Sequence, residues 1–365
     1  MLRQNYSTNN TINQLKNMGI FSSSSDNYFL GIDIGNSSLK MVELEKKGKK
    51  INLANYGFSD NIEGADFTYS DDVSFLAKSI VRLKDELGIK TNKANASLPS
   101  WSVFSSLINL HNVDPKKLDE KIIEEARKVI PLPLDEMVLD WKVIPGSDKI
   151  KGNVKVFLTG SPKKLIKKYI DVFREAKITL TNLETESFSL IRSILGNDPT
   201  TTMLIEMGEN STDFSIVKES IPFLNRSINV SGKTISSEIS SKMGVSFEQA
   251  EQFKFDLGMS NENKRAELPK IIIDAVNPII NEIKYMTDLY YNSNNDNIEK
   301  IVLSGGSSLL YNFSEYLEDL LNVKVIIANP WFKVSYPQEL EQVLSEVGPR
   351  LSVAVGLALR GADKN

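Results

Sequence analysis

Acidic, glycine, hydroxyl and lysine residues with the chemistry for binding phosphate occur together in residues 29–44, FLGIDIGNSSLKMVEL. Asp33 has the charge to hold a hydrated divalent cation, and Gly35 lets the backbone approach a ligand closely. The residues that follow, Asn36, Ser37, Ser38 and Lys40, offer amide, hydroxyl and ammonium groups that can donate hydrogen bonds to the anionic oxygens of a phosphate. This pattern indicates a phosphate site with magnesium held through water.

The residues on both sides of that turn are almost continuously apolar, as in strands that are covered on both faces. They predict a β-hairpin whose turn holds the phosphate. For this stretch taken alone, an ordinary hairpin with Asp and Gly in its turn is the alternative.

A second stretch, residues 203–217 or MLIEMGENSTDFSIV, repeats the plan. Glu206 takes the place of Asp33, and Gly208 takes the place of Gly35. The hydroxyl residues of this turn are Ser211 and Thr212, and we expect the turn to be one residue longer. A third element, residues 298–309, carries an apolar strand into Gly305, Gly306 and Ser307 and then into a helix. Glycines at that point let a nucleoside lie flat against the backbone.

Two such hairpins followed by a strand, Gly-Gly and a helix resemble the actin-like nucleotide-binding superfamily, which includes sugar kinases, DnaK chaperones, MreB and FtsA. The resemblance implies an α/β fold with a duplicated, ribonuclease H-like core in two lobes. It also implies that ATP and Mg²⁺ bind between the lobes, with Asp33 and Glu206 holding the magnesium through water.

Composition narrows the function classes. The 365 residues are 41% hydrophobic and 25% charged, which is ordinary for a globular protein of two or three domains. The net charge of -4 argues against binding nucleic acid. The absence of cysteine excludes disulfides and thiol catalysis, and the single His111 excludes a multi-histidine metal site. No apolar run reaches the ~18 residues that span a bilayer, and no signal peptide is evident.

The order of apolar and polar segments predicts a domain plan with an insert in the first lobe. We expect a disordered polar tail (1–27), a first-lobe core (28–101), an inserted α/β subdomain (102–181) and a return to that core with the interlobe link (182–199). The second lobe then comprises a core (200–233), an insert (234–297) and further core (298–333), and residues 334–365 return to the first lobe.

The insert carries the most specific resemblance. Residues 125–141, EARKVIPLPLDEMVLDW, resemble a segment of the PilM family, the cytoplasmic actin-like proteins of the type IV pilus inner-membrane assembly platform. The first hairpin, the Leu98-Pro99 strand end and the closing residues 356–360, GLALR, are similar to that family as well. Together the matches cover about residues 28–361, and FtsA is the nearest relative with a similarly placed insert.

This resemblance implies a cytoplasmic ATP-binding adaptor. PilM-like proteins hold the short cytoplasmic N-terminal segment of the membrane protein PilN in a groove between the first-lobe core and the insert. Attachment to the inner face of the cytoplasmic membrane is therefore expected through the partner, with no direct membrane span. Self-association and indirect contact with pilus motor or platform proteins are further expectations. Glu251 and Lys254 match positions from which the family contacts adenosine, and a surface ion pair is the alternative.

Hydrolysis requires a group that positions the attacking water. Glu184 and Glu186, in the link between insert and core, are the candidates, and we assign Glu184; a helix-capping or solvated acid is the alternative. Glu206 has one methylene more than the usual Asp, which displaces a magnesium-water contact by about 1 Å, so we expect at most slow ATPase activity. The alternatives to the adaptor are a filament-forming protein like FtsA or MreB and a small-molecule kinase of the same superfamily.

Overall fold

The computed structural model describes residues 27–35, 38–60, 72–144, 153–256, 258–259 and 267–362. Residues 1–26 of the expected polar tail lie outside these ranges. So do Asn36 and Ser37, two of the residues expected to contact phosphate.

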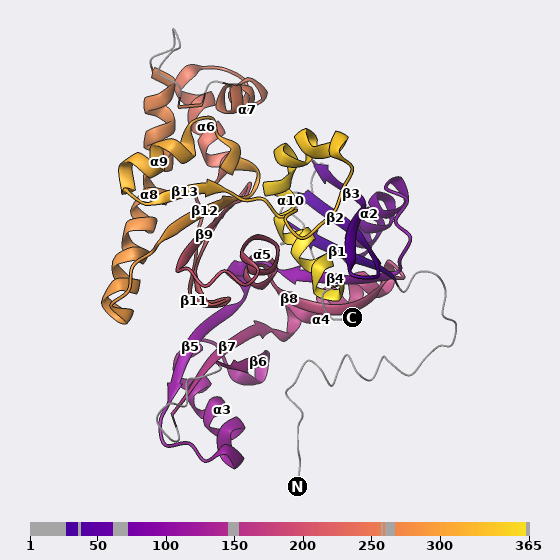
Figure 1. Cartoon of the computed structure of the whole chain (residues 1–365), viewed down its shortest axis with the longest axis vertical. Coiled ribbons are helices and arrows are strands. Elements are labelled where there is room, and N and C mark those ends of the chain that lie inside the picture. Colours follow the sequence, from indigo (N-terminus) through magenta and orange to yellow (C-terminus); the bar gives the residue numbers. More distant parts are fainter. Residues whose placement is uncertain are drawn as a thin grey trace.

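The first lobe is built on a five-stranded sheet in the order β3-β2-β1-β4-β8 (Figure 1). Its strands are β1 (Tyr28–Ile34), β2 (Ser38–Lys47), β3 (Lys50–Asp60), β4 (Lys93–Leu98) and β8 (Thr179–Thr185). The continuous apolar runs are explained by burial on both faces, because alternate side chains point to opposite sides. Leu30 and Ile32 pack under α2 (Val73–Glu86) and α4 (Lys163–Glu175), whereas Val42 and Leu44 pack under α10 (Glu341–Ala362).

The second lobe repeats this topology. Its sheet has the order β11-β10-β9-β12-β13, so in both lobes three antiparallel strands are followed by two parallel ones. The strands are β9 (Thr202–Met207), β10 (Thr212–Lys218), β11 (Ile221–Ile228), β12 (Lys300–Ser304) and β13 (Lys324–Ile327). The helices are α6 (Gly232–Met243), α7 (Phe247–Asp256), α8 (Glu267–Asn294) and α9 (Phe313–Leu321). The predicted duplication of the core is therefore confirmed.

A separate three-stranded antiparallel sheet, in the order β5-β7-β6, extends from the first lobe with helix α3 packed against it (Figure 1). Its elements are β5 (Phe104–Leu110), α3 (Leu118–Val129), β6 (Met137–Val143) and β7 (Val154–Pro162). We expected α4 to belong to this insert, but Tyr169, Val172 and Phe173 of α4 are buried in the first-lobe core instead. Helix α4 therefore packs with the first-lobe core, although the expected insert (102–181) included it.

Helices α5 (Glu186–Leu190) and α10 lie between the two sheets, together with a π-helical segment, Ile191–Leu195. Val353 and Leu357 of α10 pack against Leu204 of the second lobe. A methyl group at Gly356 would lie 2.0 Å from the carbonyl oxygen of Ser189, so α10 approaches α5 at a distance that only glycine permits. None of the helices in the described part of the chain has both the length and the apolar character needed to span a bilayer.

Candidate functional site

The two predicted hairpins have turns that are closed by the same hydrogen bond. The Gly35 N–H donates to the Ser38 carbonyl at 2.9 Å, and the Gly208 N–H donates to the Ser211 carbonyl at 2.9 Å. We expected the second turn to be one residue longer than the first. This was wrong, because the two turns have the same length. In both hairpins the glycine lies two residues after the acid and three residues before the serine.

This equivalence places charged residues directly across each hairpin. Lys40 lies opposite Asp33 in the first hairpin, and Asp213 lies opposite Glu206 in the second. Lys40 Nζ lies 2.8 Å from Asp33 Oδ2, and the Ser97 hydroxyl donates to Asp33 Oδ1 at 3.1 Å. Asp33 is 2% exposed, so its charge is balanced by direct contacts rather than by water.

The second hairpin has no such lysine opposite its acid. Glu206 Oε2 and Asp213 Oδ1 are both buried without a hydrogen-bond partner. Burial, together with the charge of Asp33, raises the pKa of Glu206 to about 8. Burial also raises the pKa of Asp213 to about 6. Burial disfavours the charged form of Lys40, but the charges of Asp33 and Glu206 outweigh this and raise the pKa of its ammonium group. The two hairpins thus bring together three acids, Asp33, Glu206 and Asp213, with one lysine, Lys40, to balance them.

Gly305 and Gly306, after β12, have different structural roles. Gly305 has φ +83°, and a methyl group there would lie 2.4 Å from the Met207 carbonyl oxygen at the end of β9. Its N–H donates to the Pro349 carbonyl of α10 at 2.9 Å. A methyl group at Gly306 would point into open space. Gly305 is therefore required by the fold, whereas Gly306 presents bare backbone.

The start of α6 completes this side of the site. The Gly232 N–H donates to the Gly208 carbonyl at 3.1 Å, and a methyl group at Gly232 would lie 2.1 Å from Ser307 Oγ. Lys254 Nζ donates to the Gly232 carbonyl at 3.2 Å and lies 2.7 Å from Glu251 Oε1. Burial lowers the pKa of Lys254, although Glu251 opposes the change. In this pair next to the second hairpin, Lys254 is buried and Glu251 is half-buried.

Thr212 was expected to contact phosphate, but its hydroxyl donates to the Val230 carbonyl at 2.6 Å. The residue is fully buried, so this hydroxyl holds β10 to the chain that leads into α6.

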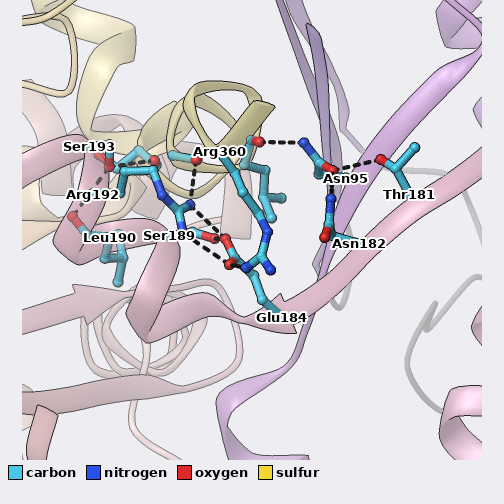
Figure 2. A network of polar contacts seen from close by, with 12 residues as sticks. Asn95, Thr181, Asn182, Glu184, Ser189, Leu190, Arg192, Ser193 and Arg360 are labelled. Carbon is cyan, nitrogen blue, oxygen red and sulfur yellow. Dashed lines mark hydrogen bonds and ion pairs between the residues drawn. The ribbon is translucent and has the colours of Figure 1, made fainter. Parts of the chain in front are cut away.

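Glu184 lies in a different environment from the one we expected for a residue that positions water (Figure 2). Its carboxylate accepts hydrogen bonds from Ser189 and Arg192, at 2.7 to 3.0 Å, and it also pairs with Arg360. Burial disfavours the charged form, but Arg192 and Arg360 outweigh it and lower the pKa of Glu184. With both oxygens engaged, Glu184 joins β8 to α10, and the structure does not place it with Asp33 and Glu206.

Glu186 is the acid of the link that faces the hairpins. The Ser100 N–H and hydroxyl both donate to Glu186 Oε2, at 2.7 and 2.8 Å. Burial, and then the charges of Glu206 and Asp33, raise the pKa of Glu186 well above its usual value. The sequence offered Glu186 as a candidate, but no sequence signal separates it from Glu184, because residues two apart on a strand point to the same face and Glu186 already begins α5. Asp213 was missed because the turn length assumed for its hairpin was wrong.

Comparisons with known proteins agree with this geometry. The chain is 22% identical over 289 residues to the cell division protein FtsA of Enterococcus faecalis, covering 72% of this chain and 66% of that protein. The FtsA of Enterococcus hirae is 20% identical over 351 residues, covering 82% of this chain and 78% of the relative. The chain thus spans slightly less than two thirds of the first of these relatives.

Among solved structures, a PilM-PilN type IV pilus biogenesis complex matches with a TM-score of 0.76 and 24% identity, over 91% of this chain and 98% of that one. MreB5 of Spiroplasma citri bound to AMPPNP matches with a TM-score of 0.54 and 11% identity, over 94% of this chain and 98% of that one. These likenesses confirm the actin-like two-lobed fold. A family model described as type IV pilus assembly protein PilM matches residues 31–362. The chain therefore belongs to the PilM family of type IV pilus assembly proteins.

Proposed function

We propose that this protein binds ATP with Mg²⁺ between its two hairpins and acts as an adaptor in type IV pilus assembly. The observation that carries the nucleotide site is the matched pair of turns, one in each lobe, in which Gly35 and Gly208 make the same hydrogen bond. The similar MreB5 structure is described as bound to AMPPNP. Gly306 supplies the bare backbone against which the nucleoside would lie.

The acids of the site fit a cation. The orphaned oxygens of Glu206 and Asp213 are acceptors without donors, and hard cations such as Mg²⁺ prefer oxygen ligands. Within the described ranges, no three His, Cys, Asp or Glu side chains are grouped closely enough to hold a metal by themselves. Water and phosphate oxygens would therefore complete the coordination, with Asp33 and Glu206 holding the ion through water. Because ATP adds negative charge to an acidic site, we expect its binding to depend on magnesium.

Hydrolysis in this site would be slow. Glu186 is the residue that we assign to orienting the attacking water, because it lies with the charges of Asp33 and Glu206 and is anchored by Ser100. Its raised pKa favours the protonated form, which is a poor acceptor for the water hydrogen. Bound magnesium would bring that pKa down, so turnover would require the loaded site.

We propose that the adaptor holds the cytoplasmic N-terminal segment of a PilN-like membrane protein. A solved structure of the same fold is described as a PilM-PilN complex. This protein has an apolar pocket, here called the α2–α4 pocket, where the first-lobe core meets the start of the insert. The pocket is lined by Ile34, Leu76, Pro99, Leu165, Lys168, Tyr169 and Val172. The pocket itself has a volume of only about 10 Å³, so we assign the partner segment to the apolar surface around it and not to its interior.

The test is binding of a fluorescently labelled peptide from the cytoplasmic start of the PilN-like protein. Leu165 is half-buried in the wall of the α2–α4 pocket, so Leu165→Glu should weaken binding at least tenfold by placing a charge against apolar groups. Leu320→Glu is the matched control, because Leu320 is an exposed leucine on α9 of the second lobe. Saturable wild-type binding that only Leu165→Glu weakens supports the adaptor. Absence of wild-type binding refutes it.

A filament of this chain is the second candidate function, because FtsA and MreB are among the proteins that it resembles. Sedimentation with and without ATP separates the two candidates. Pelleting that requires ATP and proceeds without the partner peptide favours the filament.

A further inference from the structure

We propose that one end of the first lobe, here called the basic end, lies against an anionic phospholipid surface. The basic end comprises residues 45–50, 84–93 and 174–179, which form the β2–β3 turn and the chain that enters β4 and β8. This inference goes beyond the proposed function and does not depend on it. It concerns a direct contact with lipid that requires neither ATP nor a protein partner.

The strand pairing brings these three segments to one edge of the first-lobe sheet. Tyr28 at the start of β1 pairs with Glu45 near the end of β2, and β3 begins at Lys50 directly after the turn. Lys93 pairs with Thr179 where β4 and β8 begin. Four strand spacings separate β3 from β8, so the segments line an edge about 19 Å wide. The proposed phosphate turn lies at the other end of β1 and β2, so these lysines do not serve the nucleotide.

Positive charge is concentrated at the basic end. Its segments hold nine basic and four acidic side chains, which gives a net charge of +5 in a chain whose net charge is -4. The rest of the chain is therefore negative, and the charge of the molecule is polarised. The exposed basic side chains of this end are Lys47, Lys49, Lys50, Lys90, Lys93, Arg174 and Lys177.

The fold itself does not account for several of these cations. Lys47 lies directly opposite Lys50 across the β2–β3 turn, and like charges in that arrangement destabilise a sheet. The ammonium groups of Lys49, Lys50 and Lys177 have no hydrogen-bond or ion-pair partner among the described residues. Their charge is therefore available to an external anionic partner.

The chemistry of this end fits a membrane surface. Eight of the nine basic residues are lysines, whose flexible stems let the ammonium groups reach a layer of headgroup phosphates without a fixed geometry. Residues 45–50, 84–93 and 174–179, all of them described, hold none of the exposed large apolar side chains. The contact is therefore electrostatic and involves no inserted side chain. Each lysine near an anionic membrane raises the affinity about fivefold.

Co-sedimentation of the full chain with large vesicles, without ATP or partner peptide, tests this contact. The vesicles contain phosphatidylcholine alone or with about one third phosphatidylglycerol. We expect the wild-type protein to pellet with the anionic vesicles and not with the neutral ones. Salt at about 0.5 M should release it, because screening shortens the range of the charges.

Two variants of the basic end and one matched control identify the surface. Lys49→Gln combined with Lys50→Gln should weaken vesicle binding at least tenfold, and Lys177→Gln, from the other side of the sheet, about fivefold. The control combines Lys270→Gln with Lys284→Gln, two exposed lysines of α8 in the second lobe. It removes the same charge and should change the affinity less than twofold. The urea midpoints of all three should match wild type, because the replaced side chains are exposed.

Equal pelleting with neutral and anionic vesicles overturns the proposal. Equal losses in the two double variants also overturn it, because they would report net charge and not the basic end. A DNA duplex that binds more tightly than the vesicles, and less tightly to the Lys49 and Lys50 variant, would assign this end to nucleic acid and overturn the proposal as well. Failure of the chain to bind ATP or the PilN-like peptide would overturn the proposed function and leave a positive vesicle result standing.

Discussion

Replacing Glu206 by Gln should stabilise the nucleotide-free protein against urea, and more so at pH 8 than at pH 5. Burial and the charge of Asp33 raise the pKa of Glu206 from 4.5 to about 8. Between pH 4.5 and about pH 8, Glu206 keeps its proton in the folded state, whereas it has lost that proton in the unfolded chain. The wild-type free energy of unfolding therefore falls as pH rises from about 4.5 towards 8, and a neutral glutamine does not suffer this loss.

A shift of that size corresponds to about 5 kcal/mol at pH 8. Asp33, Asp213 and Glu186 share this environment, so the raised pKa belongs partly to the group of acids and not to Glu206 alone. We therefore expect a net gain of about 2 to 3 kcal/mol for Glu206→Gln at pH 8, and less than about 1 kcal/mol at pH 5.

Urea unfolding followed by tryptophan fluorescence measures this difference. Glu209→Gln is the control, because Glu209 is an exposed acid in the turn of the same hairpin, and it should change stability little at either pH. A Glu206→Gln variant with the same stability change at both pH values would refute the reasoning, as would a loss of stability at pH 8.

Two further comparisons test the assignments around the site. Gly305→Ala should lower the free energy of unfolding by more than about 1 kcal/mol, because φ is +83° and the added methyl group would lie 2.4 Å from the Met207 carbonyl oxygen. Gly306→Ala should not lower it, because its methyl group would point into open space. Equal urea midpoints for the two variants would contradict this expectation. Glu184→Gln should destabilise the protein by about 3 kcal/mol at pH 7, with a smaller loss in acid because the lowered pKa makes its stabilisation disappear as pH falls. Per folded molecule, ATPase assays should show wild-type turnover for Glu184→Gln and at least tenfold slower turnover for Glu186→Gln; the reverse order would restore Glu184 as the catalytic candidate.

The hairpins could be predicted from sequence because the signal is local. Apolar runs on both sides of an acid and a glycine specify two strands and a turn, and the same pattern occurs twice. Register is less local. The position of Asp213 opposite Glu206 depends on the Gly208–Ser211 hydrogen bond, and counting hydroxyl residues placed that turn one residue off.

Tertiary packing explains the other differences. Glu184 and Glu186 are two residues apart in the sequence, but their partners differ. Arg360 of α10 pairs with Glu184, whereas Ser100, which follows β4, donates to Glu186. No sequence pattern reports those distant partners. In the same way, the expected insert (102–181) included α4, but the sheet against which α4 packs depends on how the chain returns from the insert.

Calorimetric titration of the purified chain with ATP, with and without magnesium, tests the central claim that the two hairpins form one nucleotide site. The account predicts saturable, magnesium-dependent binding of about one ATP per chain. It also predicts at least tenfold weaker binding for both Asp33→Asn and Glu206→Gln, one acid from each hairpin. Absence of ATP binding would contradict the account, and so would ATP binding that neither magnesium nor these two substitutions affects.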